Sequence, residues 1–220
     1  MAPDELEVCL LQPPGRENRL REVPLTSITA LVDSLVAELE PRCDIPFAFF
    51  GHSMGAIVAF ETTRRLRRMG APLPSALFVA ASRAPQLVWP HPPVRHLEDI
   101  ALLEALNRRY DSVPQVVFDD PELRALLTPT VRADMAAVET YAYETEAPFD
   151  LPLFAFGGDD DTMVGRQELQ HWSAQTTSSF RLRMMSGTHL FAQERRDDLI
   201  AEIAAALSIP TDGRSTQLAG

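Results

Sequence analysis

Short apolar runs alternate along the chain with segments whose apolar residues recur at helical spacing. Ile28, Leu31, Val32, Leu35 and Val36 show that spacing in a helix that Thr26 or Ser27 can cap. Such alternation is typical of a largely parallel sheet with helices on its faces, so we predict an α/β fold. The predicted strands are 7–11, 47–50, 76–80, 153–156 and 180–184, and the predicted helices include 28–39, 56–69 and 199–207.

The stretch from about residue 85 to 148 breaks the alternation because it holds no convincing strand. A proline-rich loop opens it, and helical patterns follow near 100–110 and 121–143. A helical insertion between two core strands is usually a lid over an active site. Two ordinary crossover helices are the alternative, but a single crossover needs far fewer residues. We therefore predict a single domain over 1–207 with this stretch as a lid, and a flexible tail at 208–220.

Composition narrows the possible functions. The chain has 220 residues, of which 45% are hydrophobic and 23% charged, as in ordinary globular domains. Its formal charge of -11 argues against nucleic acid and anionic membranes as partners. The two cysteines, Cys9 and Cys43, suggest no secreted disulfide framework, and we see no signal peptide, so we expect a cytoplasmic protein with reduced thiols.

Residues 51–55 read Gly-His-Ser-Met-Gly and match the G-x-S-x-G pattern of a nucleophile elbow. A predicted strand runs into the motif and a predicted helix leaves it, which is the setting that the motif requires. Glycines are expected on both sides because bulkier residues would clash in so tight a turn. We therefore predict that Ser53 is a nucleophile and that the backbone N–H of Met54 donates to the oxyanion. A glycine-rich turn with an incidental serine is the alternative.

A serine hydroxyl needs a base to take its proton, and in this fold the acid and the histidine follow the serine along the chain. His189 is the expected base because it lies in a loop after the 180–184 strand. His52 lies inside the elbow and is expected to point elsewhere. The acid should follow the 153–156 strand, where Asp159, Asp160 and Asp161 are consecutive, and chemistry alone does not choose among them.

Taken together, these segments resemble the type II thioesterases of polyketide and nonribosomal peptide synthesis, over about residues 8–207. The similar segments are 12–19 (family pattern P-G-R-E-x-R), 47–56 (the elbow), 77–85 (the approach to the lid), 157–164 (G-G-x-x-D-x-x-V) and 187–191 (G-G-H-F-F, with Thr188 replacing the second glycine).

The resemblance implies an α/β-hydrolase fold and a reaction. Ser53 would attack an acyl thioester on the phosphopantetheine of an acyl or peptidyl carrier protein, His189 would take its proton, and Asp161 would orient His189. The usual role of the family is editing, which clears stalled acyl groups from the assembly line. No metal or bound cofactor is implied.

The sequence departs from the family at its start. Family members begin further upstream, with a strand and a P-H-A-G-G loop that supplies a second oxyanion N–H. We expect that N-terminal strand and oxyanion loop to be missing here, and losing one such donor typically costs ~100- to 1,000-fold in rate. The alternatives are a start codon further upstream or a non-catalytic relative. A chain-releasing thioesterase or a general esterase is the other enzymatic alternative.

Overall fold

The computed structural model describes residues 6–39, 43 and 45–207. Within these residues, four parallel strands form one sheet in the order β1-β2-β3-β4. The predicted tail at 208–220 lies outside the described residues. The strands are β1 (Phe49–His52), β2 (Leu77–Ala80), β3 (Leu153–Gly158) and β4 (Phe180–Met185).

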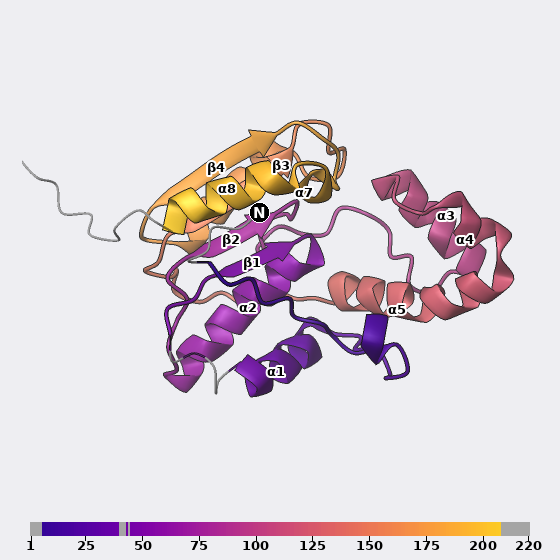
Figure 1. Ribbon diagram of the computed structural model, residues 1–220, viewed down its shortest axis with the longest axis horizontal. Helices are drawn as coiled ribbons and strands as arrows, with labels where there is room; N and C mark the ends of the chain where they lie inside the picture. The colour runs from indigo at the N-terminus through magenta and orange to yellow at the C-terminus, as the bar shows by residue number, and fades with distance from the viewer. Residues whose placement is uncertain (1–5, 40–42, 44, 208–220) are drawn as a thin grey trace, which may run out of the picture.

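Alternate residues of the central strands face opposite layers of helices. Leu77 and Val79 of β2 belong to the core beneath α1 (Ile28–Leu39) and α2 (Met54–Met69). Phe78 and Ala80 belong to a second core. That core is closed by α7 (Phe191–Glu194) and α8 (Arg196–Leu207). The sheet therefore lies between two helical layers, as Figure 1 shows. Ser27 is the residue that caps α1, since its Oγ accepts from the N–H of Ala30 at 3.2 Å.

Three helices between β2 and β3 form a separate body beside the sheet (Figure 1). They are α3 (Asp99–Tyr110), α4 (Gln115–Asp119) and α5 (Pro121–Glu139). Asp120 caps α5 by accepting from the N–H groups of Glu122 and Leu123. The helices have their own apolar cluster, formed by Val94, Leu102, Ala105, Leu106 and Met135. These helices lie within the stretch for which we predicted an insertion, and they have a small apolar core of their own. The remaining short helices are η1 (Glu17–Arg19), α6 (Arg166–Gln170) and η3 (His171–Gln175).

The predicted first strand is wrong, because residues 7–11 have no regular secondary structure. Within the described residues β1 pairs with β2 alone and ends the sheet. An extended segment gains little without a neighbour to share its backbone hydrogen bonds. Leu10 accordingly stays 91% exposed. Strand propensity at this position is therefore not matched by a pairing partner.

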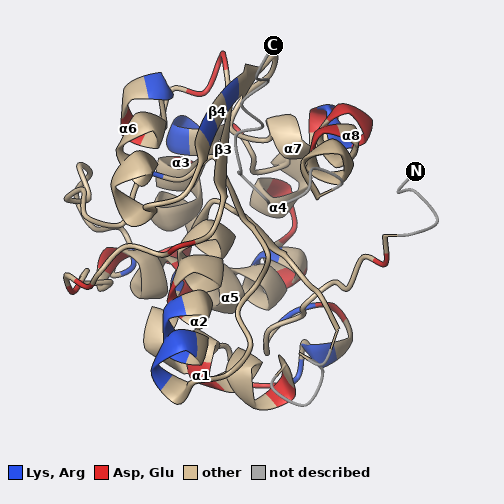
Figure 2. Cartoon of the chain, turned by 90° about the vertical axis from the view of Figure 1, so that its left-hand side faces the viewer, with Lys and Arg blue, Asp and Glu red and all other residues tan. Residues whose placement is uncertain are grey.

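Basic residues gather at the C-terminal end of α2, as Figure 2 shows. Their side chains bind the segment that leads into β3. Arg64 is buried and contacts the carboxylates of Glu61 and Glu146 at 2.7 and 2.8 Å. Arg67 and Arg68 bind the same Glu146. The carboxylate of Glu146 thus binds three guanidinium groups, and these contacts hold the segment between α5 and β3 against α2.

Candidate active site

The G-x-S-x-G segment forms a sharp turn between β1 and α2. Ser53 adopts φ 54° and ψ -121°, a conformation that residues other than glycine rarely take. Its backbone N–H donates to the carbonyl of Ala80 at 2.8 Å, which fixes the turn to β2. A Cβ atom at Gly51 would overlap the backbone of Gly55, so the first glycine is required. Gly55 has open space at the Cβ position, so the expected clash there is wrong.

Ser53 follows β1 and His189 follows β4, the two outer strands of the sheet. The His189 Nε2 lies 3.1 Å from the Ser53 Oγ. The histidine belongs to the loop between β4 and α7, and Thr188 just before it donates from Oγ1 to the carboxylate of Glu194 at 2.8 Å. Gly187 has φ +131°, and a side chain there would collide with Glu194. The loop is thus held by α7 in a conformation that suits glycine.

Among the three consecutive aspartates, Asp161 is the one that meets the imidazole. Its Oδ2 lies 2.8 Å from the His189 Nδ1, and its side chain is fully buried. Its Oδ1 accepts from the backbone N–H groups of Met163 and Val164. Asp159 and Asp160 are exposed. The turn after β3 therefore presents a single carboxylate, held on one oxygen by the backbone and free to bind the histidine with the other.

The side chains of Ser53, His189 and Asp161 form a hydrogen-bonded chain, which we call the relay. The chemistry of each group sets the direction in which it donates. An ionised carboxylate only accepts, so the Nδ1 of His189 carries the proton and donates it to Asp161. The Nε2 of the same neutral ring is then an acceptor, and it faces the Ser53 hydroxyl. A proton can pass from Ser53 to His189 as the hydroxyl attacks, and the buried carboxylate stabilises the imidazolium that forms.

Met54 begins α2 directly after Ser53. The first N–H groups of a helix have no partner within the helix, and the helix dipole adds positive potential at that end. The backbone N–H of Met54 stays the predicted oxyanion donor.

Two aromatic side chains that sequence reasoning did not place at the site contact His189. The ring centroid of Tyr110, at the end of α3, lies 4.7 Å from that of the imidazole. Burial raises the pKa of Tyr110 to about 12, so the phenol is neutral at ordinary pH. His52 contacts His189 as well, with ring centroids 5.3 Å apart. No local pattern predicts either contact, because Tyr110 and His52 are both far from His189 in the sequence.

A family model for the thioesterase domain matches residues 1–207 of the chain. The chain belongs to the thioesterase family. Among its relatives, the gramicidin S biosynthesis protein GrsT of Aneurinibacillus migulanus is 39% identical over 198 residues, which cover 90% of this chain and 77% of that protein. Thioesterase PikA5 of Streptomyces venezuelae is 35% identical over 205 residues, covering 93% and 72%.

Solved structures give the same result. The RedJ thioesterase of the prodiginine pathway in Streptomyces coelicolor superposes with a TM-score of 0.81 at 35% identity, covering 89% of this thioesterase and 77% of that chain. ClbQ of the colibactin pathway superposes with a TM-score of 0.83 at 27% identity, covering 90% and 83%. The resemblance read from the motifs and the α/β-hydrolase fold are therefore confirmed. Within the described part of the thioesterase no helix is long and apolar enough to cross a membrane.

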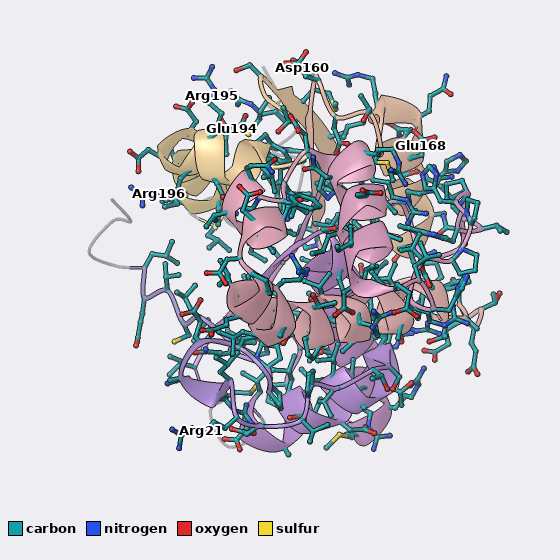
Figure 3. The ribbon with its side chains drawn as sticks, turned by 90° about the vertical axis from the view of Figure 1, so that its right-hand side faces the viewer. Arg21, Asp160, Glu168, Glu194, Arg195 and Arg196 are labelled. Atoms are coloured by element: carbon teal, nitrogen blue, oxygen red, sulfur yellow. The ribbon has the colours of Figure 1, made fainter. Side chains whose placement is uncertain are left out.

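The α3–α5 body lies in front of the sheet when the thioesterase is viewed from the right-hand side of Figure 1, as in Figure 3. Leu102 is buried in the apolar core of this body, and Val117 is buried as well. Val116 is half-exposed. Among the described residues, no group of three histidine, cysteine or acidic side chains could hold a metal ion.

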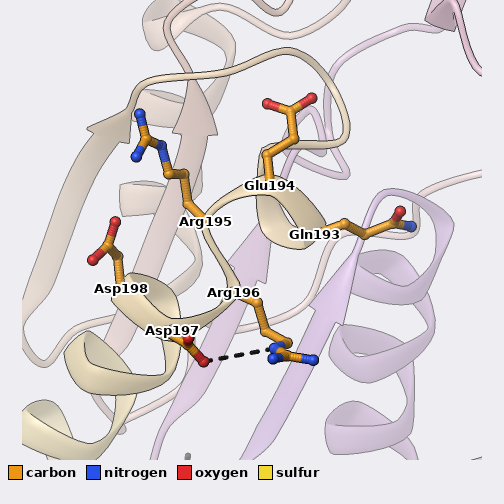
Figure 4. Close-up of a pocket in the computed structure, with 6 residues that line it drawn as sticks. All are labelled: Gln193, Glu194, Arg195, Arg196, Asp197 and Asp198. Carbon is orange, nitrogen blue, oxygen red and sulfur yellow. Dashed lines mark ion pairs between the residues drawn. The ribbon is translucent and has the colours of Figure 1, made fainter.

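A polar pocket lies where α7 meets α8 (Figure 4). It offers no nucleophile or histidine, and Arg196 and Asp197 form an ion pair of 3.6 Å in its wall. Its link to the site is Glu194, which binds the loop of His189. The pocket is lined by Gln193, Glu194, Arg195, Arg196, Asp197 and Asp198.

Proposed function

We propose that this thioesterase hydrolyses acyl groups from the phosphopantetheine thiol of acyl or peptidyl carrier proteins and so edits a polyketide or nonribosomal peptide assembly line. The observation that carries the proposal is the relay of Ser53, His189 and Asp161, whose contacts are 3.1 and 2.8 Å. Relatives in gramicidin S and prodiginine biosynthesis support the substrate class. We also propose a cytoplasmic location, in line with two cysteines that suggest no secreted disulfide framework.

The reaction proceeds in two halves. The Ser53 Oγ attacks the thioester carbonyl while the His189 Nε2 takes the hydroxyl proton. The N–H of Met54 donates to the oxyanion that develops. Collapse of the tetrahedral intermediate breaks the carbon–sulfur bond, and His189 returns the proton to the departing thiolate. Water activated by His189 then attacks the acyl-serine, which releases the carboxylic acid and restores Ser53.

The α3–α5 body acts as a lid in this proposal. It reaches the reaction centre through Tyr110, whose ring lies 4.7 Å from that of His189, centroid to centroid. Its buried side chains hold the lid together, so half-exposed positions such as Val116 are better candidates to meet an acyl chain.

A substrate panel tests the proposal. We expect kcat/KM to be highest for an acyl group on a carrier protein, lower for the same acyl group on N-acetylcysteamine, and lowest for an oxygen ester of the same acid. Ser53→Ala is the control for background hydrolysis. A preference for the oxygen ester would favour a general esterase. Cyclic products rather than free acids from a full-length acyl chain would favour a chain-releasing enzyme.

A further inference from the structure

His52, the last residue of β1, touches the catalytic loop although it lies outside the relay. Its Nε2 is 2.8 Å from the backbone carbonyl oxygen of His189, a residue 137 positions away. The expectation that His52 points away from the reaction is therefore corrected: its ring points at the segment that carries the base. The two imidazoles also meet edge to face.

The chemistry of this contact fixes the direction of the hydrogen bond. A carbonyl oxygen can only accept, so the Nε2 of His52 carries the proton and donates it. Burial lowers the pKa of His52, while the hydrogen bond to the His189 carbonyl opposes that shift. Both the neutral ring with Nε2 protonated and the imidazolium can donate this bond, so the contact does not require a particular charge.

His189 needs such a contact because its loop is neither helix nor strand. Apart from the contacts of the His189 imidazole with Ser53 and Asp161, the loop is held at neighbouring residues: Asp160 donates from its N–H to the carbonyl of Gly187, and Glu194 binds Thr188. The bond from His52 acts on the backbone of His189 itself. It also starts from the residue next to Ser53, so it ties the nucleophile's turn directly to the base.

We propose that His52 is a positioning residue, whose Nε2–H holds the backbone of His189 so that the imidazole reaches both Ser53 and Asp161. The proposal rests on His189 acting as the base in the proposed function. A misplacement of about 1 Å in a catalytic group can reduce the rate ~100-fold. We therefore expect loss of the hydrogen bond between His52 and the His189 carbonyl to reduce the rate of catalysis measurably.

Two substitutions separate positioning from simple packing. His52→Gln keeps an N–H donor at similar reach but loses the ring, whereas His52→Phe keeps an aromatic ring but loses the donor. We expect His52→Gln to keep most of the wild-type kcat. We expect His52→Phe to lower kcat about 10- to 100-fold with KM changed less than about twofold. His171→Phe, at an exposed histidine, is the matched control.

The rate at which a fluorophosphonate labels Ser53 is the second readout, because it needs an activated serine but no thioester or carrier protein. We expect His52→Gln to be labelled faster than His52→Phe, which is the order expected for kcat. Circular dichroism checks that each variant is folded. Equal labelling of both variants and the wild type, or Phe above Gln, would overturn the positioning role. If the wild type is labelled but does not hydrolyse acyl-carrier protein, the proposed function is refuted. The labelling rates of the two His52 variants would still test the positioning role.

Discussion

The phenol ring of Tyr110 lies 4.7 Å from the imidazole of His189, centroid to centroid, at a tilt of 44°. This contact joins the end of α3 to the histidine of the Ser53–His189–Asp161 chain. Aromatic pairs of this kind contribute ~0.5–1.5 kcal/mol beyond their buried area. The position of the α3–α5 body is thereby coupled to the position of the His189 ring.

We predict that Tyr110→Ala lowers kcat/KM up to about tenfold, since ~1.4 kcal/mol corresponds to a factor of ten. Tyr110→Phe should stay within about twofold of the wild type, because the ring remains and the phenol is neutral when its pKa is about 12. Steady-state kinetics on an N-acetylcysteamine thioester measures both. A loss in the Phe variant equal to that in the Ala variant would assign the effect to the hydroxyl instead of the ring.

Asp161→Asn should be far more damaging than the same change at its neighbours. The Oδ1 of residue 161 accepts from two backbone N–H groups, so an asparagine would keep its oxygen there and turn its NH₂ toward the His189 Nδ1. The imidazole would then have to accept at Nδ1, which protonates Nε2 and removes the acceptor for Ser53. We expect kcat to fall by about 10⁴-fold.

Asp159→Asn and Asp160→Asn are the matched controls, because both side chains are exposed. The backbone N–H of Asp159 donates to Met185 at the end of β4, and that of Asp160 donates to Gly187 in the histidine loop, so neither substitution removes these bonds. The kcat values of both variants should remain within about twofold of the wild type. A large loss at Asp160 with little loss at Asp161 would place the acid one residue earlier.

Gly158 lies against the loop that carries His189. A Cβ at this position would overlap the carbonyl oxygens of Thr188 and Gly187. We predict that Gly158→Ala destabilises the fold by about 1–3 kcal/mol, because backbone must shift to admit the methyl group. Gly55→Ala is the control, since its methyl group meets open space within α2 and should leave the free energy of unfolding unchanged or raised. Urea unfolding curves measure both, and equal stabilities would contradict the crowding.

Glu146 predicts how acid affects stability. Burial raises its pKa, but hydrogen bonds from Arg64, Arg68 and Arg67 outweigh burial and lower the pKa to about 2. A folded-state pKa below the unfolded value means that the carboxylate stabilises the fold at neutral pH. This contribution is fully present above the ordinary glutamate pKa of ~4.3 and is lost as the pH falls toward 2.

Glu146→Gln should therefore lower the Tm at pH 7 and bring it closer to that of the wild type as the pH falls from 5 toward 2. Glu104→Gln is the control, because Glu104 is exposed and lies 3.8 Å from a single exposed arginine. Thermal unfolding across this pH range measures the difference. A constant gap between Glu146→Gln and the wild type would show that the carboxylate's charge has no part in the effect.

Local patterns predicted most of the elements, and the exceptions have physical causes. The helix over 28–39 matched because Ser27 caps it and its apolar face repeats regularly. The first core strand runs to His52, past its apolar run, because it ends where the elbow turns and not where hydropathy drops. Residues 7–11 had the pattern of a strand without a partner to pair with.

The candidate site likewise contains residues that local motifs predicted and residues that they did not. Ser53 and His189 could be predicted because each follows a strand in a recognisable motif. Chemistry could not choose Asp161 from three aspartates, since the choice depends on which carboxylate the turn buries. The contacts of Tyr110 and His52 with His189 arise only when distant segments pack together, so no spacing along the sequence encodes them.

The central claim is that Ser53, activated by His189, removes the acyl group from a carrier protein. The most direct measurement follows the mass of an acyl-loaded carrier protein over time with wild-type enzyme and with Ser53→Ala. The wild type should return the carrier to its free-thiol mass, and the variant should be slower by at least about 10³-fold while remaining folded by circular dichroism. Release by Ser53→Ala at a rate within a few fold of the wild type would contradict the account.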